Sequence, residues 1–195
     1  DRPAKIALKF DTGMARLGFT RQDVPGLVER LRGLPAVRPV LVMSHLAVAD
    51  ETDGLDFTAE QLAIFKDITA ALKTAFPGLK ASLANSAGGL AFPEARHDIV
   101  RAGVSLYGTN PFQGTARESL GRELTPVMEV STRLVQVHAL RPGQSISYGR
   151  TFVAERDMVV GIVACGYANG YNRRLSNRAA MVVREKRAPV LGRVC

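Results

Sequence analysis

Short apolar runs alternate with longer amphipathic segments over the first 120 residues. The apolar runs that predict buried strands lie at residues 5–10, 40–43, 80–84 and 98–100. Segments with helical periodicity separate the first three of these runs. The order strand, helix, strand, helix is typical of an α/β fold with a parallel sheet.

Two helices have recognisable starts. The first is expected to be capped by Thr20 or Asp23 and to run to about Arg32. The second is expected to begin at Thr58, which would form a capping box with Gln61. Apolar residues at helical spacing predict which face of this second helix is buried. The residues of that face are Leu62, Phe65, Ile68, Leu72 and Phe76.

The pattern changes after residue 120. Residues 127–137 alternate between apolar and polar positions, which predicts a strand with one buried face. Turn signals follow, and further strands are expected at 159–164 and 180–183. Short strands separated by turns indicate an antiparallel β domain.

Polar side chains follow each predicted strand of the first part. In a β/α barrel the carboxyl ends of all strands meet at one rim, where ligands bind. A complete barrel takes roughly 250 residues. We therefore expect the C-terminal half of a TIM-type barrel over 1–120 and a partial antiparallel β domain over 121–195, with the boundary near 113–124. The polar residues expected on the rim are Lys9, Asp11, His45, Asn85, Ser86 and Arg101.

Composition narrows the class of protein. The net charge is +8, but the arginines are scattered and tryptophan is absent, so we expect a solvated basic surface and no nucleic-acid partner. A positive field of this kind attracts an anionic cofactor or a carboxylate substrate. No apolar run approaches the roughly 20 residues that span a membrane. Cys165 and Cys195 show no metal spacing, so we expect no metal site and reduced thiols in the cytoplasm.

Six segments of the chain carry a family signature. They lie at 8–18, 44–47, 82–87, 101–108, 147–152 and 166–171, and read LKFDTGMARLG, SHLA, SLANSA, RAGVSLYG, SYGRTF and GYANGY. Together they resemble the alanine racemases, a family of pyridoxal 5'-phosphate enzymes. The resemblance implies a cofactor-binding barrel followed by a β domain, and interconversion of L- and D-alanine by two-base proton transfer. It also implies a homodimer in which the second subunit completes each active site.

The resemblance also implies which residues contact the cofactor. Arg101 would meet the pyridine nitrogen, and because arginine keeps its proton, that nitrogen would stay unprotonated and the cofactor would be a weaker electron sink. A hydroxyl with nearby backbone N–H groups makes a workable phosphate cradle. Ordinary structural roles in turns and ion pairs remain open for each of these residues. The implied cofactor contacts are His45, Asn85, Ser86, Arg101, Gly103 and Val104.

Four further residues receive roles at the substrate. Arg16 would orient the substrate carboxylate, which suits the bidentate geometry of a guanidinium. Tyr148 would be the base on one face of the α-carbon, and Tyr167 would lie at the substrate entrance. Lys9 matches a lysine that becomes carbamylated in the family. The alternative for Lys9 is an unmodified side chain paired with Asp11.

The departures from the family pattern limit the expected activity. The family's Schiff-base lysine precedes the segment at 8–18, so we expect a fragment that lacks this lysine and is inactive alone. A broad amino-acid or serine racemase of the same fold remains an alternative. So do a non-catalytic pyridoxal phosphate-binding protein and a fragment that supplies only structure or dimer contacts.

Overall fold

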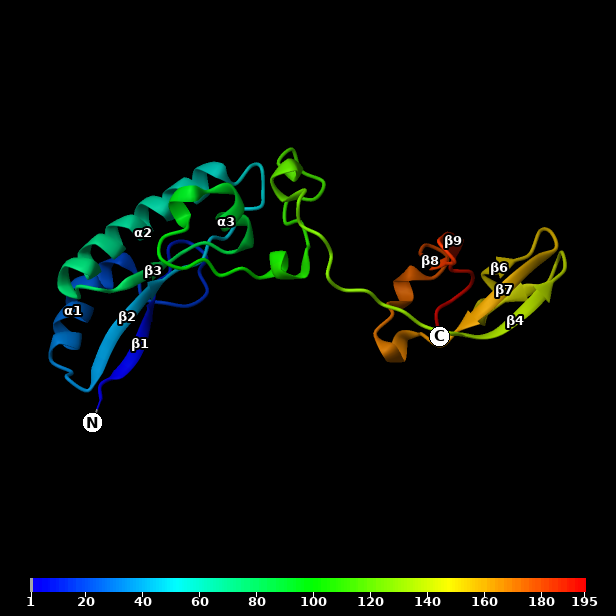
Figure 1. Cartoon of the computed structure of the whole chain (residues 1–195), viewed down its shortest axis with the longest axis horizontal. Helices are drawn as coiled ribbons and strands as arrows, with labels where there is room; N and C mark the ends of the chain where they lie inside the picture. The colour runs from blue at the N-terminus through cyan, green and yellow to red at the C-terminus, as the bar shows by residue number, and fades with distance from the viewer. Residues whose placement is uncertain (1) are drawn as a thin grey trace. The chain divides into compact units, whose positions relative to one another are not determined.

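The computed structural model describes residues 2–195 and groups them into two compact units (Figure 1). The first unit ends at Met128, and the second is Glu129–Cys195. The first combines a parallel sheet with helices, and the second contains antiparallel strand pairs. Within the described residues, no helix is both long enough and apolar enough to pass through a membrane.

The first unit begins with the alternating order of strands and helices that the sequence predicts. Its elements in chain order are β1 (Ala4–Lys9), α1 (Val24–Arg32), β2 (Val37–Met43), α2 (Leu55–Ala75), β3 (Lys80–Ser82) and α3 (Ser86–Ala91). Short 3-10 helices lie at Arg21–Asp23, Pro93–Ala95, Val104–Tyr107 and Glu118–Gly121.

The three strands form one parallel sheet in the order β1-β2-β3 (Figure 1). Lys9 pairs with Met43, and Met43 pairs with Ser82, so the three strands finish level with one another. Leu8 of β1 and Val42 of β2 are buried in the core that this sheet shares with α1 and α2. The helices therefore cover the sheet while its carboxyl edge stays available for the loops that follow each strand.

The first helix agrees with its sequence signals. Asp23 is the N-cap residue of α1, and the helix ends at Arg32 as expected. The carboxylate of Asp23 accepts hydrogen bonds from the backbone N–H and the hydroxyl of Thr20, at 2.6 and 2.8 Å. These two bonds join both predicted capping residues in one turn.

The capping box predicted at Thr58 is wrong. α2 begins at Leu55 after the N-cap residue Gly54, so Thr58 lies inside the helix. The Thr58 hydroxyl is buried and has no hydrogen-bond partner within residues 2–195, and the Gln61 amide is bonded to other segments. The predicted apolar face is correct, since Phe65 and Ile68 are fully buried.

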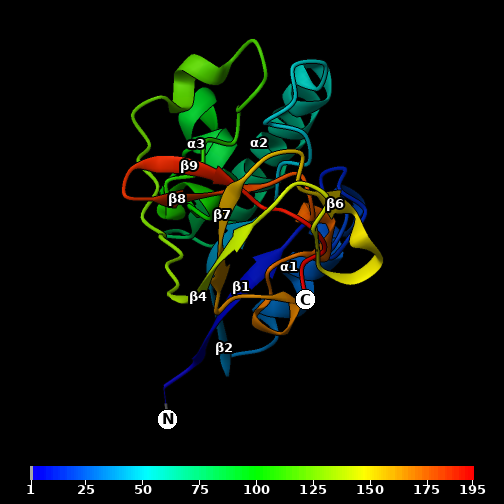
Figure 2. The same ribbon diagram turned by 90° about the vertical axis from the view of Figure 1, so that its right-hand side faces the viewer.

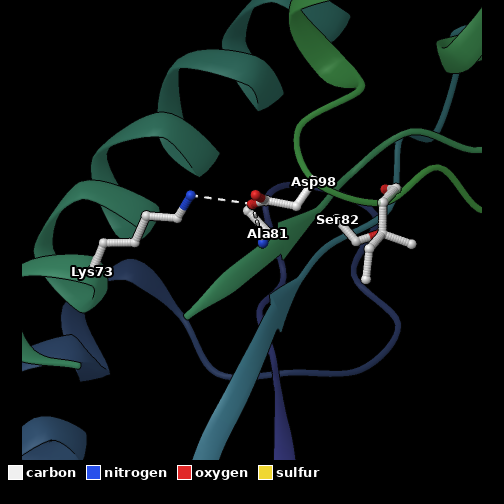
Figure 3. Close-up of polar contacts among 5 residues, drawn as sticks. Lys73, Ala81, Ser82 and Asp98 are labelled. Atoms are coloured by element: carbon white, nitrogen blue, oxygen red, sulfur yellow. Dashed lines mark hydrogen bonds and ion pairs between the residues drawn. The ribbon is translucent and has the colours of Figure 1, made fainter. Parts of the chain in front are cut away.

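The fourth predicted strand, at residues 98–100, does not form. The Asp98 carboxylate accepts the backbone N–H of Ala81 at 2.8 Å, and it also contacts Lys73 Nζ at 3.1 Å (Figure 3). A neighbouring strand would use that N–H of β3 in a ladder. The N–H groups of Asp98 and Ile99 both donate to Ala81 O, so the segment is fixed to one residue instead of pairing along β3. β3 itself ends at Ser82 instead of residue 84.

The second unit is built from antiparallel pairs: β4 with β7, β5 with β6, and β8 with β9 (Figure 1, Figure 2). Its strands are β4 (Leu134–Leu140), β5 (Ser145–Ile146), β6 (Phe152–Val153), β7 (Met158–Val163), β8 (Ala180–Val183) and β9 (Lys186–Pro189). Its 3-10 helices are Tyr148–Arg150, Tyr167–Asn169 and Arg173–Leu175. The predicted strands near 159–164 and 180–183 are confirmed.

The strand predicted over 127–137 is only partly present. β4 starts at Leu134, and its partner β7 supplies residues only as far as Val163. Residues before Arg133 therefore meet no neighbouring strand in the described part of the chain, and alternation alone does not make a strand. Val127, which belongs to the first unit, instead donates its N–H to Tyr107 O of the same unit.

Candidate active site

Loops from three strands converge at the carboxyl edge of the parallel sheet. Lys9 is the last residue of β1, His45 follows β2, and Ser86 begins the helix that follows β3. Arg101 reaches this edge from a later loop and hydrogen-bonds to the backbone after both β2 and β3. All four residues therefore lie at the same end of the sheet.

Arg101 is anchored by five hydrogen bonds. Nη1 donates to the carbonyl oxygen of Ser82 at 3.0 Å and to its hydroxyl at 2.6 Å. Nη2 donates to Ser44 O at 2.6 Å, to Leu83 O at 3.4 Å and to His45 Nδ1 at 3.2 Å. Burial lowers the pKa of Arg101 from its ordinary value, although an arginine in a protein keeps its proton. The guanidinium is therefore a fixed cation whose plane cannot turn freely.

His45 is held as a neutral acceptor. Arginine has no acceptor atom, so His45 Nδ1 must be unprotonated and the ring proton lies on Nε2. Burial is the largest cause of the lowered pKa of His45, and the charges of Arg101 and Lys9 add to it. The imidazole therefore stays uncharged next to a permanent cation.

Positive charge dominates the site. Burial and then the charges of Arg101 and Arg16 lower the pKa of Lys9, against a smaller opposing effect of Asp11. Lys9, Arg16 and Arg101 have no carboxylate within ion-pair distance in the described part of the chain. The site is therefore suited to bind anions.

The loop that carries Arg16 is closed by Asp11. The Asp11 carboxylate accepts the backbone N–H groups of Gly13, Ala15 and Arg16, at 2.8, 3.1 and 3.1 Å. These bonds, led by that from Gly13, lower the pKa of Asp11. Among the described residues Asp11 forms no ion pair with Lys9, so the alternative pairing considered for Lys9 is not found.

Gly18 lets this loop return to β1. Its φ of 126° favours glycine, and a Cβ there would lie 2.7–2.8 Å from backbone atoms of Lys9, Phe10 and Asp11. The close approach allows Phe19 N–H to donate to Lys9 O at 2.9 Å and Asp11 N–H to donate to Phe19 O at 2.8 Å. Arg16 is therefore presented on a short loop whose two ends are bonded together.

Hydrogen-bond donors gather around Ser86. The Ser86 hydroxyl oxygen accepts Gly103 N–H at 2.8 Å and Ser105 N–H at 3.3 Å, and it lies 3.1 Å from the Ser105 hydroxyl. Val104, between these residues, has a backbone N–H with no acceptor in the described part of the chain. Ser86 therefore occupies the N–H groups of Gly103 and Ser105, and the Val104 N–H and the Ser86 hydroxyl proton are donors that this small region offers to an anion.

Asn85 has a visible structural task. Its side-chain oxygen accepts Gly88 N–H at 2.9 Å and caps α3, while its amide nitrogen donates to Leu46 O at 3.2 Å.

Ser82 contacts Arg101 directly, although the sequence did not single it out as a site residue. The feature that could have indicated its role is its position, because a serine near the carboxyl end of a predicted buried strand lies at the edge where ligands bind.

The remaining two candidates belong to the second unit. Tyr148 starts the 3-10 helix Tyr148–Arg150, and its side chain is 72% exposed. Tyr167 starts Tyr167–Asn169 and is 59% exposed. Both phenols are therefore accessible to a ligand or to another chain.

Comparison with known proteins identifies the family. Residues 1–111 match the family model "Alanine racemase, N-terminal domain", and residues 127–195 match "Alanine racemase, C-terminal domain". This chain belongs to the alanine racemase family. The alanine racemase of Nitratidesulfovibrio vulgaris (strain Miyazaki F) is 56% identical over 190 residues, which are 97% of this chain and 51% of that protein. That of Lawsonia intracellularis is 46% identical over 191 residues, covering 97% and 50%.

Solved alanine racemase structures agree with this assignment. The biosynthetic alanine racemase from Pseudomonas aeruginosa is 38% identical with a TM-score of 0.82, over 100% of this chain and 52% of that one. The Bacillus anthracis enzyme with bound L-Ala-P is 31% identical with a TM-score of 0.84, over 99% and 50%. The Bartonella henselae enzyme with covalently bound pyridoxal phosphate is 26% identical with a TM-score of 0.77, over 98% and 50%.

The chain spans about half the length of the curated alanine racemases it matches.

The site of this chain fits pyridoxal phosphate by the chemistry of its hydrogen-bond donors. The Val104 N–H and the Ser86 hydroxyl suit a phosphate, and the Nε–H of Arg101 has no acceptor among residues 2–195 while both its terminal nitrogens are occupied. The nitrogen of a pyridine ring is a hydrogen-bond acceptor, so it could accept the free Nε–H of Arg101.

Proposed function

We propose that this chain forms part of an alanine racemase that interconverts L- and D-alanine with pyridoxal 5'-phosphate. The observation that carries the proposal is the Arg101 cation, fixed by five hydrogen bonds beside neutral His45. The first unit would be part of a β/α barrel, which its level parallel strands support. The second unit would be part of the β domain.

Three groups of this chain would hold the cofactor. The Ser86 hydroxyl and the N–H groups of Gly103 and Val104 would bind its phosphate, with Asn85 fixing the start of α3 through its cap. Arg101 would donate its Nε–H to the pyridine nitrogen, and because the guanidinium keeps its proton the nitrogen would stay unprotonated. The bound cofactor supplies an electron sink that acidifies the substrate α-hydrogen.

Two other residues would act on the amino acid. Arg16 has no carboxylate partner in the described residues, and its guanidinium would bind the substrate carboxylate in the bidentate manner. Tyr148 would take the α-proton on one face and return it in the reverse direction. A phenol needs positive neighbours to act as a base near neutral pH, and Arg16 and Arg101 would supply that charge.

We also propose a homodimer in which Tyr148 and Tyr167 serve the site of a second copy. The exposure of both side chains supports this arrangement. The proposed location is the cytoplasm, which the two free thiols of Cys165 and Cys195 support.

The test is racemisation by the full-length enzyme. Purified enzyme with pyridoxal phosphate is given L-alanine or D-alanine, and circular dichroism follows the loss of optical activity. We expect both substrates to reach the same racemic end point. Faster turnover of serine than of alanine would favour the broad-specificity alternative. Tight cofactor binding without racemisation of either amino acid would favour a non-catalytic cofactor carrier.

A further inference from the structure

A buried polar chain lies beneath the site, and the proposed function does not use it. It consists of Gln61 on α2, Thr12 after β1 and Ser44 after β2, all at most 3% exposed. Gln61 Nε2 lies 3.1 Å from Thr12 Oγ1, and Thr12 Oγ1 lies 2.9 Å from Ser44 Oγ. Burying three polar side chains is costly unless their hydrogen bonds are satisfied, so this chain needs a reason.

The chain has only one possible direction. The Ser44 hydroxyl donates its single proton to Phe10 O at 2.8 Å, so it must accept from Thr12. Thr12 then has no proton left for Gln61 and accepts from the Gln61 amide. The donors run from Gln61 to Thr12, to Ser44 and to Phe10 O, with each hydroxyl proton used once.

Gln61 also fixes the backbone of the loop after β2. Its Nε2 donates to His45 O at 3.0 Å, and its Oε1 accepts Ala47 N–H at 2.9 Å. One amide therefore holds this loop on both sides of Leu46. All the hydrogen atoms of the Gln61 amide have acceptors, so the orientation of the amide is settled by its partners.

Two residues that this arrangement holds, Ser44 and His45, contact Arg101. The Ser44 carbonyl accepts Arg101 Nη2 at 2.6 Å, and the His45 ring accepts the same nitrogen at 3.2 Å. Gln61 does not contact Arg101, but it bonds to the backbone of His45 and, through Thr12, to Ser44, the two consecutive residues that receive Arg101. A shift of this loop would therefore move the guanidinium and its imidazole partner together.

We propose that Gln61 is a positioning residue of the racemase, which sets the His45–Arg101 pair by holding the loop after β2 and the Thr12–Ser44 chain. This inference rests on the proposed function. A purely structural alternative is that Gln61 only fills space under the loop. Thr58, one turn earlier on α2, offers the comparison, because its hydroxyl is equally buried but has no hydrogen-bond partner among the residues that the structure describes.

The test compares Gln61→Met with Thr58→Val in the full-length enzyme. Both changes keep side-chain volume, but only the first removes hydrogen bonds to the site's loops. We expect Gln61→Met to lower kcat by about tenfold to a hundredfold, as small displacements of reacting groups do. KM for alanine should change less, because Asp11 independently holds the Arg16 loop. Thr58→Val should leave kcat and KM unchanged.

A second measurement separates positioning from packing. Nitrogen-15 NMR of labelled histidine should show one His45 tautomer, with the proton on Nε2, in the unmodified enzyme and in Thr58→Val. Gln61→Met should give a mixture of tautomers or a shifted Nδ1 signal, even in samples that remain folded. A Gln61→Met enzyme with unchanged kcat and an unchanged His45 signal would overturn the proposal.

Ser44→Ala tests the same chain if Gln61→Met does not fold. It removes one hydroxyl, leaves the Ser44 carbonyl in place, and should shift the His45 signal in the same direction with a smaller loss of kcat. No change in either quantity would also overturn the proposal. The NMR measurement needs no turnover, so an unmodified enzyme that fails to racemise alanine contradicts the proposed function while the test of Gln61 still stands.

Discussion

Arg101 donates to the unprotonated Nδ1 of His45, with 3.2 Å between Nη2 and Nδ1. This contact joins a permanent cation to a neutral base, and it requires the His45 proton to lie on Nε2. Burial and the charge of Arg101 lower the pKa of His45 in the same direction. Acid that protonates His45 would therefore remove an acceptor from Arg101 and place two like charges in contact.

His97 is a second source of acid sensitivity. Its ring meets Phe65 edge-on with 5.2 Å between centroids, and burial followed by the charge of Lys73 lowers its pKa from 6.5, against the opposing charge of Asp98. Because the pKa of His97 is lower in the folded state, the unfolded state binds more protons than the folded state at pH values between the two pKa values. The free energy of unfolding is therefore retained above pH 6.5 and decreases as the pH falls.

We therefore expect the free energy of unfolding of the full-length enzyme to decrease as the pH falls below about 6.5. His97→Gln should make this decrease shallower, because it removes the group whose pKa is lowered. Urea unfolding at a series of pH values measures the effect. Equal slopes for His97→Gln and the unmodified enzyme would contradict the cause assigned to His97.

Ser82 supports Arg101 from β3. Its hydroxyl accepts Arg101 Nη1 at 2.6 Å and donates to Ile99 O at 2.8 Å, in the region where Asp98 and Ala81 fix the following loop (Figure 3). Ser82→Ala should lower the free energy of unfolding by about 1–3 kcal/mol, because it leaves buried polar groups without a partner. Chemical denaturation gives the value.

The matched control for Ser82 is Thr69→Val on α2. Thr69 is also buried, but its hydroxyl has no hydrogen-bond partner in the described part of the chain. We expect this change to cost little or to stabilise the protein, since it removes an unpaired polar group. Equal losses for Ser82→Ala and Thr69→Val would show that the Ser82 hydroxyl does not hold Arg101.

Lys9 is predicted to react with carbon dioxide. A carbamate forms when a neutral amine adds carbon dioxide and releases a proton, so the lowered pKa of Lys9 favours the reaction. Carbon-13 NMR of the full-length enzyme in labelled bicarbonate should show a carbamate signal that disappears in Lys9→Arg. Lys5→Arg, at an exposed position of the same strand, should retain it. A signal that survives Lys9→Arg would assign the carbamate elsewhere.

Periodicity predicted the parts of the fold that depend on burial. The strands β1 and β2, the helices α1 and α2 and the apolar face of α2 follow from it, because side chains on one face must meet the core. It failed where a side chain competes with the backbone. Asp98 takes the N–H that a fourth strand would need, and Gln61 bonds to distant loops instead of its own helix start.

The site was predictable only in outline. Polar residues after parallel strands indicated the carboxyl edge, and Lys9, His45 and Ser86 do lie there. The hydrogen bonds that orient Arg101 could not be predicted, because they join residues up to 57 positions apart. Ser82 and Gln61 were missed as site residues for the same reason: their partners are close only in the folded chain.

The last prediction concerns Tyr148 in the full-length enzyme. If Tyr148 is the base for one enantiomer and a second group serves the other, each direction of racemisation needs both groups. Tyr148→Phe keeps the ring and removes only the hydroxyl. Racemisation should then fall in both directions by about a hundredfold to ten-thousandfold, the usual loss for a positioned acid or base. Tyr167→Phe is the matched control, since this tyrosine is also exposed but is proposed to lie at the entrance.

Solvent exchange distinguishes a lost base from a damaged site. In deuterated water, Tyr148→Phe should still exchange the α-hydrogen of the enantiomer served by the second group, because that group remains. Exchange should disappear for the other enantiomer, since the proton on its face has no acceptor. Proton NMR of L- and D-alanine incubated separately measures both rates. Equal exchange of the two enantiomers would remove Tyr148 from the reaction and leave it as a turn residue before Gly149.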